Sequence, residues 1–264
     1  MSASAQTGQA QPGQQRVGWY IYGITTKDVE INSGAPAVGD PPGKVEVVRH
    51  GDVAALVSQV DVDRPLGRPD DLLAHERLLD GVAAKAPVLP IRFGAVVASR
   101  EAVLDELLTP HGDEFARALR EIEGRFEYLV RAKYVERAVV GEVLSENPTV
   151  AQLRERLAGQ PEEATRDERI QLGQMIAQAV EAKRTEDTQK LIEAVESVVV
   201  ANAVRPPSNE FDTANIAFLV ERERQSDFEN ALQRVAADWD GRVTLRLLGP
   251  VAPYDFVQPP APPQ

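Results

Sequence analysis

Apolar residues recur at two spacings in the first half of the chain, and these spacings predict short strands interleaved with helices. VGWYIYGI is apolar on both faces, as a central strand requires. KVEVVRHGDVAALVSQV predicts a β-hairpin that turns near His50, Gly51 and Asp52. A proline and two acids predict the start of a helix at PDDLLAHERLLDGVAAKA, and VLPIRFGAVV predicts a fourth strand. With Ser99 as the N-cap of REAVLDELL, the order is β-ββ-α-β followed by helices.

A second series of elements begins after Gly124. RFEYLVRAKY predicts a strand, which is followed by helices around 135–145 and 149–158 and a helical stretch over 162–203. The middle of that stretch, EAKRTEDTQK, is wholly polar, so it is either a solvent-exposed arm or a helix pair broken near Thr185. NIAFLVER, SDFENALQRVAADW and RVTLRLL then predict a strand, a helix and a strand.

The order of these elements indicates an α+β fold, because strands and helices do not alternate strictly. We expect two ferredoxin-like α/β-sandwich domains, the second with a long helical, coiled-coil-like insertion. The predicted organisation is a disordered tail over 1–16, an N-terminal domain over 17–123, a C-terminal domain over 124–258 and a proline-rich tail over 259–264.

Composition narrows the partners and the cellular compartment. The 264 residues include 41 acidic and 29 basic side chains, for a formal charge of −12, which disfavours nucleic acid as a partner. There is no apolar run of roughly 18 residues to span a bilayer, and the first sixteen residues lack the pattern of a signal peptide. Cysteine is absent. We therefore expect a cytoplasmic protein without a membrane partner.

Few residues offer catalytic chemistry. Among the three histidines, His75 lies on the face of Leu72, Leu79 and Val82 with Asp71 one turn away, and we interpret it as a buried histidine with satisfied hydrogen bonds. The sequence has no GxSxG elbow, no P-loop and no GxGxxG fingerprint. We expect no enzymatic activity, cofactor or metal, and a catalytic site around His75 and Asp71 stays as an alternative.

Two stretches carry candidate partner-binding residues. VLPIRFG places Arg92 beside Phe93 at a strand end, where Arg92 either pairs with a carboxylate or contacts a partner. In LLGPVAPYDFV, Gly249 permits a positive φ and the prolines end the ladder of hydrogen bonds. Pro253, Tyr254 and Phe256 follow, and the two aromatic side chains either pack back on the fold or project outward.

Four motifs in a fixed order give the chain a family resemblance. YIYGI, VLPIRFG followed by a helix with paired leucines, NIAFLV and GPVAPYDFV together resemble the gas vesicle protein family GvpL/GvpF, from about Trp19 to Val257. The family's ending usually reads like GPWPPYSFV, so this chain departs from it at Val251, Ala252 and Asp255.

The resemblance implies a non-enzymatic accessory or structural protein of gas vesicle assembly. It implies binding to the hydrophobic shell subunit and to other gas vesicle accessory proteins, either as a minor wall component or as an assembly factor. The expected location is the cytoplasm and the gas vesicle, and the oligomeric state is open. A small-ligand-binding regulatory module built on ferredoxin-like domains is the alternative.

Overall fold

The computed structural model describes residues 16–32 and 34–257, which form two compact units. Unit 1 contains the described residues up to Val82 together with Val88–Arg120, and unit 2 contains Ala83–Pro87 and the described residues from Glu121 onward. The tails predicted over 1–16 and 259–264 lie outside the described residues, apart from Arg16.

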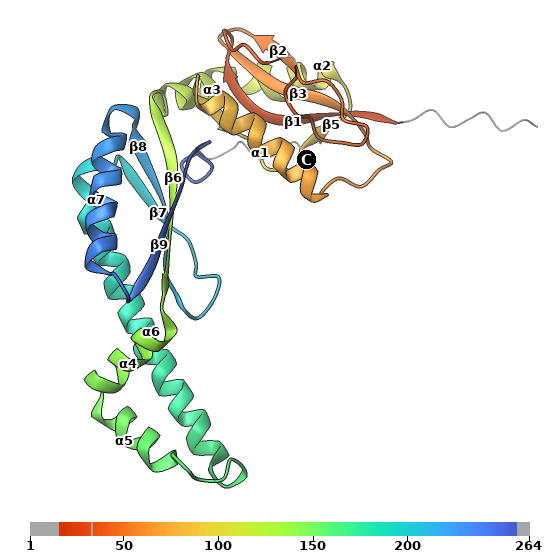
Figure 1. The fold of residues 1–264 in the computed structure, drawn as a ribbon. Helices are drawn as coiled ribbons and strands as arrows, with labels where there is room; N and C mark the ends of the chain where they lie inside the picture. Colours follow the sequence, from red (N-terminus) through yellow and green to blue (C-terminus); the bar gives the residue numbers. More distant parts are fainter. Residues whose placement is uncertain (1–15, 33, 258–264) are drawn as a thin grey trace, which may run out of the picture. The chain divides into compact units, whose positions relative to one another are not determined.

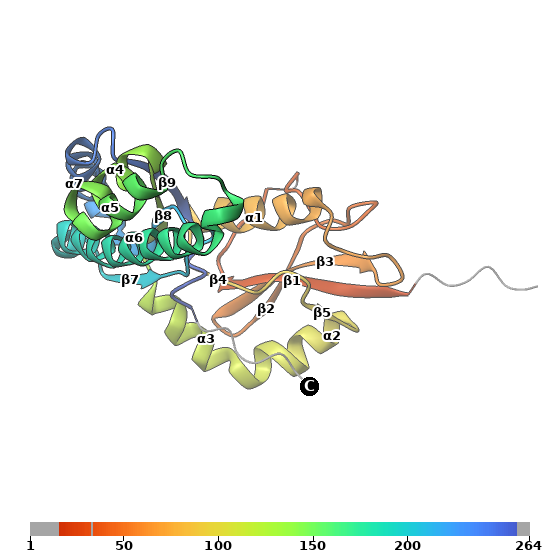
Figure 2. The same ribbon diagram turned by 90° about the horizontal axis from the view of Figure 1, so that it is seen from below.

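Unit 1 is built on an antiparallel sheet with the strand order β2-β3-β1-β4, and β5 also pairs with β1. Its elements are β1 (Val17–Thr26), β2 (Glu46–His50), β3 (Val53–Asp61), α1 (Pro69–Ala83), β4 (Val88–Pro90), β5 (Val96–Val97), α2 (Arg100–Ala102), a π-helical turn (Val103–Leu108) and α3 (Thr109–Glu121). In Figure 2, α1 lies on one side of the sheet and α2 and α3 lie on the other. The central strand β1 is therefore buried on both faces.

A glycine in β1 brings the helix close to the sheet. A Cβ at Gly23 would lie 2.8 Å from a methyl group of Leu79 in α1 and 2.8 Å from the backbone oxygen of Leu89 in β4. Because real Cβ atoms do not approach other atoms so closely, only glycine allows Leu79 to pack against the strand here.

Unit 2 is built on a second antiparallel sheet with the order β7-β8-β6-β9. Its elements are β6 (Arg125–Tyr134), α4 (Glu136–Glu146), α5 (Pro148–Leu157), α6 (Arg166–Val195), β7 (Ala201–Val204), β8 (Asp212–Glu221), α7 (Gln225–Asp238) and β9 (Val243–Val251), with 3-10 turns at Glu163–Thr165, Glu196–Val198 and Arg222–Arg224. Helices α6 and α7 cover one face of the sheet (Figure 1). We call the opposite face the far face.

The core of unit 2 lies between the sheet and these helices. Tyr128, Phe218 and Phe228 meet at its centre, with ring centroids 5.4 and 5.5 Å apart for the two pairs that include Phe228. Alternate residues of β6 point into this core, as period-2 burial requires, so the residues between them lie on the far face.

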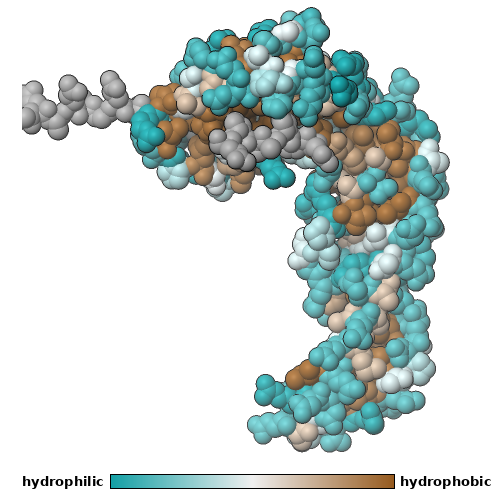
Figure 3. All heavy atoms as spheres, turned by 180° about the vertical axis from the view of Figure 1, so that it is seen from behind, coloured by the Kyte–Doolittle hydropathy of each residue, from teal (hydrophilic) through white to brown (hydrophobic). Residues whose placement is uncertain are grey.

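Helices α4 and α5 pack on the N-terminal half of α6 and form a helical arm that extends beyond the sheet (Figure 1). Hydrophilic side chains dominate the surface of the arm in Figure 3. Within the described ranges, no helix carries an apolar stretch of the length that a bilayer requires.

The structure corrects two expectations about these elements and excludes one of two alternatives left open for α6. The fourth strand predicted over 88–97 is two short strands, β4 and β5, because the chain turns over Ile91–Ala95. The helix predicted to reach residue 203 ends earlier, and β7 begins within the predicted helical stretch. The run of β-branched residues before β7 suits either a helix or a strand. Helix α6 runs unbroken through Thr185.

Candidate interaction site

The last strand ends at a bulge that only glycine can form. Gly249 has φ +134°, and a Cβ there would lie 2.9 Å from the Tyr128 ring and 3.0 Å from the backbone oxygen of Glu127. The register of β9 against β6 shifts at this point, so that Leu248 pairs with Leu129 and Val251 with Glu127. The positive φ predicted for Gly249 is confirmed.

The residues after β9 fold back onto the far face and are held there by polar contacts. The buried carboxylate of Glu127 accepts the backbone N–H of Asp255 at 2.9 Å. Arg205 donates to the Asp255 carboxylate and lies 3.4 Å from that of Glu127. We call Ala252–Val257, together with Glu127 and Arg205, the C-terminal clasp.

The two carboxyl groups of the clasp have opposite pKa shifts. Burial raises the pKa of Glu127 well above its ordinary value, and the hydrogen bond to the Asp255 side chain raises it further. Burial alone would raise the pKa of Asp255, but hydrogen bonds from Arg205 and Glu127 together lower it. Protonated Glu127 therefore donates to ionised Asp255, which pairs with Arg205.

The predicted binding residues of this segment are only partly accessible. Pro253 is buried, and Tyr254 and Phe256 are half-buried. Glu127 was not predicted to have a special contact, although a carboxylate within the apolar run RFEYLV is the sequence signal for one.

The other two predicted residues lie in unit 1, in the turn between β4 and β5. Phe93 is half-buried and packs on Tyr20 and His75, with ring centroids 5.7 and 5.6 Å away. The side chain of Arg92 is exposed, and it forms no ion pair with any residue of the described ranges, so the predicted carboxylate partner is not found.

His75 is enclosed in the same aromatic cluster. Its Nδ1 lies 2.9 Å from the hydroxyl oxygen of Tyr20, and its side chain is 3% exposed. Burial lowers the pKa of His75 to about 4, against the opposing effect of a hydrogen bond to the backbone of Ile91, so the imidazole is neutral at pH 7. The interpretation of His75 as a buried, hydrogen-bonded histidine is confirmed.

Asp71, which was predicted to lie one turn from His75, has a local structural role. Its carboxylate accepts the backbone N–H groups of Gly39, Gly67 and Arg68 at 2.9–3.2 Å. Leu72 was predicted to lie on the same face as His75, but it is 42% exposed, because it lies beside the buried stripe of the helix and not within it.

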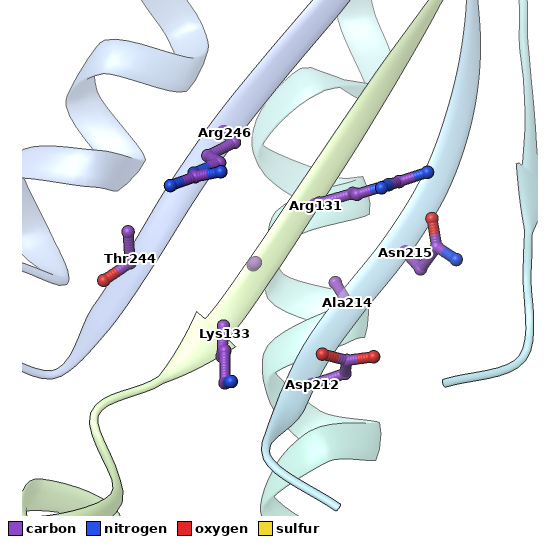
Figure 4. A pocket seen from close by; sticks show the side chains of 8 residues that line it. Arg131, Lys133, Asp212, Ala214, Asn215, Thr244 and Arg246 are labelled. Carbon is purple, nitrogen blue, oxygen red and sulfur yellow. The ribbon is translucent and has the colours of Figure 1, made fainter. Parts of the chain in front are cut away.

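A pocket of about 460 Å³ lies on the far face of unit 2 and was not predicted from the sequence. Figure 4 shows its side chains on three adjacent strands. They are Arg131, Ala132 and Lys133 from β6, Asp212, Ala214 and Asn215 from β8, and Thr244 and Arg246 from β9. The sequence signal for this pocket was the presence of basic residues on one face of β6 and β9. Only the pairing of these strands brings the residues together.

Comparison with known proteins gives consistent matches over nearly the whole chain. The family model described as gas vesicle synthesis protein GvpL/GvpF matches residues 18–258. Gas vesicle protein F of Streptomyces sp. (strain CB03234) is 35% identical over 244 residues, which cover 90% of this chain and 99% of that protein. Gas vesicle protein L of the same strain is 27% identical over 267 residues, with 90% and 91% covered.

The same architecture is found in a solved structure. The crystal structure of the gas vesicle protein GvpF from Anabaena sp. PCC7120 superposes with a TM-score of 0.76 at 24% identity, covering 92% of this chain and 99% of that one. Both therefore share a mixed α and β fold with two antiparallel sheets.

Proposed function

The chain belongs to the GvpL/GvpF family of gas vesicle synthesis proteins, and from this premise we propose that it is a non-enzymatic accessory protein that binds the hydrophobic gas vesicle shell subunit. It would act in the cytoplasm and on the growing vesicle, in contact with other gas vesicle accessory proteins. Membership of the family supports the association with gas vesicles, and the exposed apolar edge of unit 2 supports the binding step.

That edge is strand β7, and the proposal rests on the exposure of its apolar side chains. Val204 in β7 is 57% exposed, and Val200 just before it is 42% exposed. Within the described residues, β7 pairs only with β8, so its outer edge offers unpaired backbone groups beside apolar side chains. An apolar chain in extended conformation would complete the sheet there by adding a strand.

We interpret both units as ferredoxin-like. In unit 2 the chain order β6-helices-β7-β8-α7-β9 corresponds to β-α-β-β-α-β, with the helical arm inserted in the first crossover. Unit 1 has the same strand order in its sheet, although a loop replaces the first helix. In this fold each sheet is open, so each unit has edge strands with which a partner could pair.

The predicted residues contribute in two ways under this proposal. Arg92 contacts the partner directly because its guanidinium is exposed, and Phe93 anchors the turn that presents it. Pro253, Tyr254 and Phe256 keep the C-terminal clasp folded on the far face and expose part of their aromatic surface to a partner.

Co-expression with the shell subunit and affinity capture test the proposal. Wild type is compared with Val204→Lys, Arg92→Ala and Tyr254→Ala, and circular dichroism checks that each variant is folded. Ile170→Lys is the matched control, because Ile170 is 51% exposed on the helical arm. We expect wild type and Ile170→Lys to capture the shell subunit and Val204→Lys to lose most of the capture. Absence of capture by folded wild type would refute shell binding.

A further inference from the structure

The pairing of β6 with β9 places like charges opposite each other on the far face. Arg131 is the direct cross-strand partner of Arg246, and Lys133 is that of Thr244. Like charges directly opposite on one face of an antiparallel pair destabilise the sheet. Figure 4 shows the two guanidinium groups turned apart, with Arg131 reaching toward β8 and Arg246 pointing away from it.

These cations contrast with a fourth one on the same face. Arg205 is neutralised in the C-terminal clasp by the ionised carboxylate of Asp255. Over the part of the chain that the structure describes, Arg131, Lys133 and Arg246 form no ion pair, although the chain has 41 acidic residues. The acid on the rim, Asp212, accepts the backbone N–H groups of Ser208 and Asn209 at 2.7 and 3.1 Å.

The pocket also offers a hydrogen-bond acceptor and an apolar border. The side-chain oxygen of Asn215 is buried and accepts no hydrogen bond from the described residues. Beyond the cations, the next cross-strand pair on this face is Leu129 and Leu248, of which Leu248 is 43% exposed. A volume of about 460 Å³ lies within the range of specific ligand sites.

We propose that the pocket formed by Arg131, Lys133, Asn215 and Arg246 binds an acidic peptide segment of a partner protein. Carboxylates of the segment would pair with the guanidinium groups, which present the fork that matches a carboxylate. A backbone N–H of the segment would donate to the Asn215 oxygen, and an adjacent apolar side chain would cover Leu248. A simple anion lacks the last two groups, and a nucleic acid is repelled by the overall charge of −12. This inference does not rest on shell binding.

Fluorescence anisotropy of the full chain with a labelled peptide of alternating glutamate and valine tests the proposal. The same peptide with glutamine in place of glutamate is the comparison, and inorganic phosphate is the competitor. We expect binding of the glutamate peptide to be at least tenfold tighter than that of the glutamine peptide. Millimolar phosphate should displace little of it. Equal binding of the two peptides, or full displacement by phosphate, would overturn the proposal.

Variants locate the site. Arg131→Gln with Arg246→Gln should weaken binding of the glutamate peptide at least tenfold. The matched control is Arg154→Gln with Arg156→Gln, which removes two exposed cations from α5. Thr244→Glu is a second test, because its carboxylate would compete from within the pocket, and Thr244 is exposed, so the sheet should tolerate it. Thermal melting checks folding. Equal losses in the α5 control, or unchanged binding in folded Thr244→Glu, would place the peptide elsewhere.

Discussion

Gly249 shows how one residue sets the course of the chain end. We predict that Gly249→Ala destabilises the protein by about 1–3 kcal/mol, because a Cβ would enter the space of Tyr128 and the positive φ disfavours any other residue. Urea unfolding measures the change. Gly173→Ala is the control: Gly173 lies exposed in α6 with open space around it, so alanine there should stabilise by up to about 1 kcal/mol. Equal stability of Gly249→Ala and wild type would contradict this explanation of the bulge.

Glu127 should make stability depend on pH in a defined direction. Its pKa is raised by burial, from 4.5 to about 8, so the folded state holds this proton more tightly than the unfolded chain does. The resulting stabilisation is complete below pH 4.5 and is lost as the pH rises through about 8. Glutamine cannot lose a proton and keeps an acceptor for the N–H of Asp255.

We therefore predict that Glu127→Gln gains stability relative to wild type as the pH rises from 5 to 8.5. The measurement is the difference in melting temperature between the two proteins across this range, which cancels the titration of other groups. Asp61→Asn serves as a control outside the clasp. A difference that stays constant, or that shrinks with rising pH, would show that Glu127 is ionised in the folded state.

The sequence predicted one of these two residues and missed the other, for a physical reason. The positive φ of Gly249 was predicted because glycine adopts this backbone conformation without the steric penalty of a side chain. The role of Glu127 depends on Asp255, which is 128 positions away, and no local pattern reports such a contact. For the same reason the sequence named Tyr254 and Phe256 but not the polar contacts that hold them.

Helix α6 shows the same limit for a whole element. Its polar middle left open an exposed arm or a break near Thr185, and the structure shows one continuous helix. Some of these polar residues contact the sheet and the loop before β8, while others, such as Glu186, lie exposed on the opposite side of the helix. Arg184 donates to the backbone oxygens of Asp212 and Glu210, and Thr188 donates to that of Thr213 at 3.0 Å. Apolar periodicity cannot detect a helix that packs through hydrogen bonds.

Asp187 is the buried centre of this polar contact and gives a prediction at the level of the element. Its carboxylate accepts the hydroxyl of Tyr134 at 2.7 Å and the guanidinium of Arg242 at 2.6 Å, and its side chain is 3% exposed. We predict that Asp187→Ala destabilises the protein by about 3 kcal/mol, because it leaves the buried hydroxyl of Tyr134 without its acceptor and removes one of the two carboxylates that pair with Arg242, the other being Glu142.

Urea unfolding of the neighbouring variant Glu186→Ala provides the control. The Glu186 side chain is 67% exposed and pairs with Lys190 on the surface, so we expect a loss below about 1 kcal/mol. If Asp187→Ala were no more destabilised than Glu186→Ala, the polar contact of α6 with the sheet would not contribute to stability.

For the molecule as a whole, order along the chain was more informative than any single motif. The α+β class and the family resemblance are confirmed by the match over residues 18–258 and by the GvpF fold. Strand β7 was missed because its apolar run continues that of the preceding helix. The far-face pocket was missed because Arg131 and Arg246 become neighbours only when their strands pair. Local sequence patterns predict helices and strands. A site formed by residues of several strands can be recognised only once the pairing of those strands is known.

The two proposed interactions differ in physical character, and salt should separate them. Capture of the shell subunit at the β7 edge would depend on apolar contact and backbone hydrogen bonds, which salt does not weaken. Peptide binding in the far-face pocket would depend on exposed charges, which are screened beyond about 10 Å at 0.1 M salt and beyond about 3 Å at 1 M. Measured on the same protein between 50 mM and 1 M sodium chloride, capture should therefore persist while peptide affinity falls at least tenfold. If both were lost together, a single electrostatic surface would account for both, and the assignment of the shell subunit to the β7 edge would be wrong.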